Sequence, residues 1–224
     1  DAARAVHNAL PETSARWAAV GLSQGGQAAW AANELNSSYG QGLELIASVS
    51  LSPPTDLAPL ARAASDGTLT TPQKGLLPYL LYGAQQVDPT LDPRDYSGTV
   101  AQTNAELLLA CQGTNTATKE RAVSEMAPTE FAPRSPEAEQ KLFDLIGRYT
   151  LPQVRTTVPM FVAYGARDDI VLPQWTADAV RAACALGDRV VAQEQPEQGH
   201  NVSDDSAMQF LAAEFAGASV PSTC

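Results

Sequence analysis

The chain has 224 residues, of which 44% are hydrophobic, and a formal net charge of -11 at pH 7. This length and apolar content allow one globular domain with a sizeable core, and no apolar run approaches the roughly 20 residues that cross a bilayer. We therefore expect a soluble protein without stable membrane anchoring. The acidic surface would repel phosphate backbones, so we expect no nucleic-acid partner.

The first 54 residues predict helices at about 1–10 and 24–37 and strands at about 16–21 and 45–51. Both strand candidates are short apolar runs that end at turn or breaker residues. This pattern is typical of strands in a parallel sheet that helices cover on both faces.

Between residues 55 and 150 the strand signal disappears, and prolines punctuate short helical pieces. Thr71 and Ser135 each precede a proline, as an N-cap does when proline occupies the first helical position. We interpret 55–150 as a helical cap inserted between two parts of the core, 1–54 and 151–224. Such a cap is where substrate contacts on loops would concentrate.

After the cap the alternation of strand and helix resumes. Strands are predicted at 158–164 and 189–192, and helices at 174–185 and 204–216. The complete order predicts an α/β protein with a doubly wound parallel sheet.

The most specific motif reads Gly-Leu-Ser-Gln-Gly at residues 21–25. It follows the apolar run 17–20 and opens into an alanine-rich helical pattern, so it predicts strand, sharp turn and helix. A serine between glycines on such a turn is the nucleophile elbow of an α/β-hydrolase. Ser23 is therefore our candidate nucleophile.

A serine hydroxyl needs a nearby base, and the chain has two histidines, His7 and His200. The fold places its residues in the order serine, acid, histidine, which selects His200. His7 precedes the serine on a predicted amphipathic helix, where a surface or packing role explains it. A capping or structural role remains the alternative for His200.

The third group is a carboxylate that orients the imidazole and stabilises its charged form. Asp168 and Asp169 both follow the strand that ends at Gly165, and the spacing favours Asp168 on the turn. Asp169 is the neighbouring alternative. Asp56 is a second alternative, because some hydrolases carry the acid after the preceding strand.

The oxyanion of the reaction needs two or more backbone donors, one of them from the residue after the nucleophile. The N–H of Gln24 fills that role here. The other donor should follow an earlier strand, and no such strand is predicted ahead of residue 16. The strand before the elbow would then present an apolar, unpaired edge, which proteins normally avoid. We expect this chain to be the C-terminal portion of a longer hydrolase.

Three cysteines, Cys111, Cys184 and Cys224, are too few for a disulfide scaffold and lack metal-site spacing. In a secreted protein their odd number indicates a partner elsewhere. We hypothesise a Cys184–Cys224 disulfide and a disulfide from Cys111 to the N-terminal fragment as a second chain. Three free thiols in a cytosolic enzyme are the alternative.

The motifs at 17–29, 52–57, 164–168 and 199–200 are similar to those of the secretory lipases, a family of extracellular triacylglycerol lipases and esterases. The resemblance covers most of the chain. It implies a cap after the second strand, secretion, and ester hydrolysis without a metal. By position, it places the catalytic triad on Ser23, Asp168 and His200. The family's upstream half has no counterpart here.

These features predict a serine carboxylic-ester hydrolase that cleaves lipid-like or other hydrophobic esters. Leu77, Tyr79, Leu80 and Tyr82 are candidates for contact with the acyl chain, although packing inside a cap helix explains the same pattern equally well. No phosphate-binding glycine loop or ligand cluster supports a cofactor. The alternatives are a peptidase or acyltransferase on the same fold and a non-catalytic hydrolase-like subunit.

Overall fold

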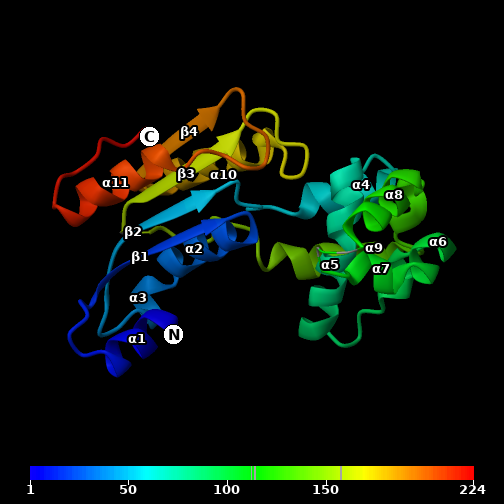
Figure 1. Ribbon diagram of the computed structural model, residues 1–224, viewed down its shortest axis with the longest axis horizontal. Helices are drawn as coiled ribbons and strands as arrows, with labels where there is room; N and C mark the ends of the chain where they lie inside the picture. Colours follow the sequence, from blue (N-terminus) through cyan, green and yellow to red (C-terminus); the bar gives the residue numbers. More distant parts are fainter. Residues whose placement is uncertain (112, 114, 157) are drawn as a thin grey trace. The chain divides into compact units, whose positions relative to one another are not determined.

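The strands of the protein form one parallel sheet. The computed structural model describes residues 1–111, 113, 115–156 and 158–224. Within this part of the chain the strands are β1 (Arg16–Leu22), β2 (Glu44–Leu51), β3 (Met160–Gly165) and β4 (Val190–Gln195). They are arranged in the order β1-β2-β3-β4, all parallel, so that their carboxyl ends meet at one edge (Figure 1). The predicted α/β class is confirmed.

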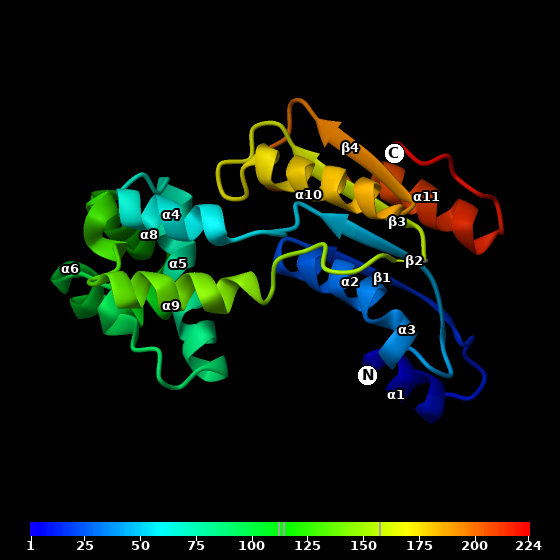
Figure 2. The ribbon, with the colours of Figure 1, turned by 180° about the vertical axis from the view of Figure 1, so that it is seen from behind.

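Helices cover both faces of this sheet (Figures 1 and 2). On one face, α2 (Gln24–Glu34) packs against β1 and β2, and α10 (Pro173–Leu186) packs against β3 and β4. On the other face, α11 (Asp205–Phe215) packs against β2 and β3. Because both faces are covered, every residue of β3 is buried. This explains why the strand is a continuous apolar run rather than an alternating one.

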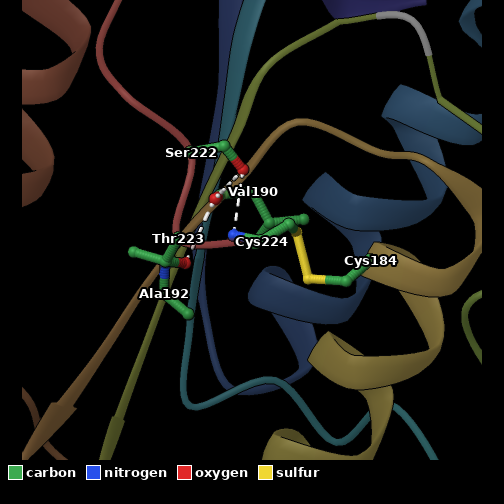
Figure 3. Close-up of a disulfide and its surroundings, with 6 residues drawn as sticks. All are labelled: Cys184, Val190, Ala192, Ser222, Thr223 and Cys224. Carbon is green, nitrogen blue, oxygen red and sulfur yellow. Dashed lines mark hydrogen bonds between the residues drawn. A yellow bond between two sulfur atoms is a disulfide. The ribbon is translucent and has the colours of Figure 1, made fainter.

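The outer edge of β4 is covered by residues 222–224 (Figure 3). The backbone N–H of Thr223 donates to the carbonyl of Val190 at 2.8 Å, and Ala192 N–H donates to Thr223 Oγ1 at 2.9 Å. A disulfide between Cys184 and Cys224 ties this segment to α10. The predicted Cys184–Cys224 pair is confirmed, and Cys111 is free and exposed.

The opposite edge of the sheet is β1, which pairs with β2 alone among the described residues. Val20 and Leu22 on this strand are 50% and 44% exposed. Beside it, α1 (Ala2–Ala9) is tied to α3 (Asn36–Tyr39) and the following turn by Arg4, which donates to the carbonyls of Tyr39 and Gln41. The two edges of the sheet therefore differ, because one is covered and the other exposes apolar side chains.

The chain folds into two compact units, Asp1–Asp56 with Thr150–Cys224 and Leu57–Tyr149. The second unit is helical. Its elements are α4 (Ala58–Asp66), α5 (Thr71–Val87), η1 (Pro93–Tyr96), α6 (Thr99–Thr103), α7 (Ala105–Leu109), α8 (Thr116–Glu125), η2 (Pro128–Phe131) and α9 (Pro136–Gly147). It has its own core, which includes Leu77, Leu81, Phe131 and Leu142. No helix within the described ranges is both long and apolar enough to span a membrane.

Two local predictions in the helical unit had different outcomes. Ser135 is the N-cap of α9 and accepts from Ala138 N–H, as predicted. The prediction that Thr71 caps α5 is wrong, because Thr70 does so. Thr70 Oγ1 accepts from Gln73 N–H while the Gln73 side chain accepts from Thr70 N–H, and this reciprocal pair fixes the start one residue earlier.

Candidate active site

Ser23 lies on a sharp turn between β1 and α2. Its backbone has φ 56° and ψ -123°, a strained conformation for a residue with a side chain. The turn is tight enough that a Cβ on Gly21 would lie 2.0 Å from the carbonyl carbon of Gly25. Ser23 N–H donates to the carbonyl of Leu51 at 2.8 Å, which anchors the turn to the end of β2. The motif therefore forms the predicted nucleophile elbow geometry.

The side chains of Ser23, His200 and Asp168 form one hydrogen-bonded chain. Nε2 of His200 lies 2.8 Å from Oγ of Ser23, and Nδ1 lies 2.8 Å from Oδ2 of Asp168. A carboxylate can only accept, so Nδ1 carries the proton and Nε2 is the acceptor for the serine hydroxyl. The structure brings together the three side chains that the sequence selected.

Asp168 is buried and held in place by the backbone. Its Oδ1 accepts from Ile170 N–H at 2.9 Å and from Val171 N–H at 3.0 Å, which leaves Oδ2 directed at His200. The alternative acids are placed differently. Asp169 is exposed, and Asp56 lies within hydrogen-bonding distance of Thr150 Oγ1.

His200 follows a loop that packs against the end of β3. A Cβ on Gly165 would lie 2.1 Å from the carbonyl oxygen of Gly199, so this close approach needs a glycine. The carbonyl of His200 accepts from Ser52 Oγ at 2.7 Å. Sequence reasoning assigned no role to Ser52. His7, the other histidine, donates from Nδ1 to the carbonyl of Thr13, a local contact beside α1.

Gln24 is the first residue of α2. The N–H groups of the first helical turn have no acceptor within the helix, and they carry the positive end of the helix dipole. The predicted oxyanion donor thus lies directly after Ser23, at a position suited to an anion.

The predicted acyl-chain residues all lie in the helical unit, with different surroundings. Leu77 is fully buried, Leu80 is half-buried, and the Tyr79 hydroxyl donates to the carbonyl of Ala110 at 2.7 Å. Tyr82 lines a cavity of about 320 Å³ together with apolar side chains such as Pro78. Of the four candidates, Tyr82 is the one on the cavity wall.

Across the described ranges, no group of three or more His, Cys, Asp or Glu residues is placed to hold a metal ion. The side chains of Ser23, His200 and Asp168 meet at the carboxyl-end edge of the sheet. Their arrangement suits proton transfer to and from a serine hydroxyl.

The model of the family described as secretory lipase matches residues 1–220. The chain belongs to the secretory lipase family. No curated protein sequence matches it. The family membership agrees with the resemblance that the sequence motifs carry.

Solved structures with the same fold include a lipase and an esterase. Candida antarctica lipase A in its closed state superposes with a TM-score of 0.74 at 17% identity, covering 99% of this chain and 54% of that one. The rice cell wall degrading esterase LipA from Xanthomonas oryzae superposes with a TM-score of 0.66 at 20% identity, covering 96% of this chain and 60% of that one. A putative hydrolase from Legionella pneumophila superposes with a TM-score of 0.67 at 14% identity, covering 96% of this chain and 59% of that one.

These likenesses establish the α/β-hydrolase fold for this chain. The chain spans between 54% and 60% of the length of the first two structures named above.

Proposed function

We propose that this chain is part of a serine carboxylic-ester hydrolase, of the lipase or esterase type, that acts on lipid-like or other hydrophobic esters. The observation that carries the proposal is the continuous hydrogen-bonded chain from Ser23 Oγ through His200 to Asp168. Membership of the secretory lipase family supports the same reaction class.

In the proposed mechanism, His200 Nε2 accepts the hydroxyl proton as Ser23 Oγ attacks the ester carbonyl carbon. The tetrahedral oxyanion accepts a hydrogen bond from Gln24 N–H. His200 then returns the proton to the leaving alkoxide, and the acyl group stays on Ser23. Water, deprotonated by His200, attacks the carbonyl carbon of this acyl-enzyme. The bond to Ser23 Oγ then breaks, His200 returns the proton to Oγ, and the carboxylic acid is released.

Asp168 stabilises the imidazolium that exists in both halves of the reaction. Its carboxylate is buried and already accepts two backbone N–H bonds, so it need not reorganise when the charge on His200 appears.

We further propose that a segment outside this chain completes the sheet beyond β1 and supplies a second oxyanion donor. The exposed apolar edge of β1 supports this, as does the fraction of the solved structures that the chain spans. A disulfide from exposed Cys111 would link this segment covalently. Secretion is consistent with the Cys184–Cys224 disulfide, since disulfides persist in oxidising compartments.

For the acyl chain, we propose contact with the cavity that Tyr82 lines. Its wall includes Pro78, Leu81 and Phe131, and apolar walls of this kind bind hydrocarbon without a polar partner. Leu77 would instead serve the core of the helical unit, because it is fully buried.

The reaction class is tested with a fluorophosphonate probe on the complete protein. The probe should attach to wild-type protein and not to the Ser23→Ala variant, while Ser14→Ala, at an exposed serine, leaves labelling unchanged. Labelling that survives Ser23→Ala would refute the nucleophile. Hydrolysis of p-nitrophenyl esters without cleavage of peptide anilides would separate the proposal from a peptidase.

The proposed partner segment is tested by intact mass. The protein purified from its natural source without reductant should have a mass greater than the 23.6 kDa of this chain. If Cys111 forms the link, a reductant should release the additional segment. A chain of 23.6 kDa alone that hydrolyses esters at full rate would overturn this part of the proposal.

A further inference from the structure

Two adjacent residues at the end of β2, Leu51 and Ser52, contact the backbone of the proposed nucleophile and of the proposed base. Ser52 follows β2, and its Oγ donates to the carbonyl of His200 at 2.7 Å. The residue before it, Leu51, accepts from Ser23 N–H at 2.8 Å. These two hydrogen bonds fix the backbone of Ser23 and of His200 to two adjacent residues, Leu51 and Ser52.

Ser52 is itself rigidly held. Its N–H donates to the carbonyl of Ala163 in β3 at 2.8 Å, and the residue is fully buried. A buried hydroxyl that is anchored on one side and bonded to a loop on the other restrains that loop, because breaking the bond would leave a polar atom unsatisfied.

The backbone of Ser52 is strained. Its φ is +44°, in the left-handed region where glycine is the residue without steric cost. Together with Ser23, it makes the two non-glycine residues with positive φ among those that the structure describes. Strain of this kind persists only where the surrounding structure over-determines the conformation, and it concentrates at functional sites.

We propose that Ser52 is a positioning residue for His200, which sets the distance between Nε2 and Ser23 Oγ; this inference rests on the proposed function. The hydroxyl of Ser52 does not reach the imidazole. It fixes the carbonyl of His200, and thereby the start of the side chain whose Nε2 must stay within 2.8 Å of Oγ. A misplacement of a catalytic group by about 1 Å can lower the rate by about 10²-fold.

Two variants separate the hydroxyl from the backbone strain. Ser52→Ala removes the hydroxyl and keeps the strain, whereas Ser52→Gly removes both. Each should lower kcat per titrated active site by about 3- to 10-fold, as expected for one hydrogen bond, with KM unchanged. The rate of fluorophosphonate labelling should fall by the same factor, and Ser52→Gly should melt at or above the temperature of Ser52→Ala.

Ser48 offers a matched control on the same strand. It lies inside β2, four residues before Ser52, is fully buried, and its Oγ accepts from Asn33 Nδ2 at 2.8 Å. Ser48→Ala removes a buried hydroxyl of the same kind and should leave kcat per active site at the wild-type value.

Three results would overturn the inference. If kcat per active site is unchanged in both Ser52 variants while wild type is active, Ser52 is structural and the proposed function stands. If Ser52→Gly restores what Ser52→Ala loses, backbone strain rather than the hydroxyl governs the rate. If the complete wild-type protein neither labels nor hydrolyses esters, the proposed function fails, and the inference fails with it.

Discussion

Nε2 of His200 lies 2.8 Å from Oγ of Ser23, although the two residues are 177 positions apart in the chain. The approach is built by the parallel sheet. Ser23 follows the carboxyl end of β1, and His200 follows that of β4, with β2 and β3 between them. Parallel strands bring such ends to one edge, so residues distant in sequence meet there.

The acid is tested by exchanging neighbouring aspartates. Asp168→Asn should lower kcat on the order of 10⁴-fold, because an amide can stabilise the wrong imidazole tautomer and cannot offset the imidazolium charge. Asp169→Asn is the matched exchange, since Asp169 is exposed one position away. It should retain nearly all of the activity. Equal losses in the two variants, measured by ester hydrolysis, would contradict the assignment of Asp168.

The glycines on either side of Ser23 should differ in their tolerance of alanine. A Cβ on Gly21 would meet the Gly25 carbonyl carbon at 2.0 Å, whereas a Cβ on Gly25 has no heavy atom within 4 Å apart from its own neighbours. Gly21→Ala should therefore lower the free energy of unfolding by about 1–3 kcal/mol or more through overpacking. Gly25→Ala should be neutral or slightly stabilising, because alanine favours helix. Urea unfolding of the two variants measures the difference, and equal stabilities would argue against the tight elbow.

The Cys184–Cys224 disulfide should contribute substantially to stability. It closes a loop of 40 residues, for which the chain-entropy model gives about 4 kcal/mol and measured bridges about 2–4 kcal/mol. The double exchange Cys184→Ser with Cys224→Ser should lower the free energy of unfolding by that amount, and it should loosen residues 222–224 from β4. Ser219→Ala is the control, because Ser219 is exposed. A double variant as stable as the control would contradict this prediction.

Glu34 predicts a pH dependence of stability. Burial raises the pKa of its carboxyl above the ordinary value of 4.5, and hydrogen bonds from the backbone N–H groups of Gln153 and Val154 offset part of the rise. A raised folded-state pKa means that the stability Glu34 contributes is fully present below 4.5 and is lost as the pH rises through the folded-state pKa.

Glu34→Gln cannot ionise at this position. The unfolding free energy of the variant, relative to wild type, should therefore increase as the pH rises above 4.5. Chemical unfolding at several pH values measures this difference, in which the contributions of the other carboxyl groups cancel. A constant difference, or one that decreases with pH, would be inconsistent with the raised pKa.

The sequence predicted those parts of the site that have a local signature. The flanking glycines and the change from strand to helix periodicity predict the elbow at Ser23. The order serine, acid, histidine along the chain then selected Asp168 and His200. The sheet was predictable for a similar reason, since short apolar runs between breakers have few alternatives.

The contribution of Ser52 could not be predicted. Its bond to the His200 carbonyl joins residues 148 positions apart, and serine is too common for its position to stand out. A positive φ at a residue that is not glycine also has no sequence signal. The error at Thr71 has a local cause: two adjacent threonines could cap α5, and the reciprocal bonds with Gln73 select Thr70.

The central claim is that an acyl group passes through Ser23, and trapping that intermediate tests it most directly. The complete protein is mixed with an excess of a p-nitrophenyl ester, quenched in acid within the first turnovers, digested and analysed by mass spectrometry. The account predicts the acyl mass on the peptide that contains Ser23, together with a burst of p-nitrophenol equal to the number of active sites. Sustained ester hydrolysis in the Ser23→Ala variant, or an acyl group found on a different residue in wild type, would contradict it.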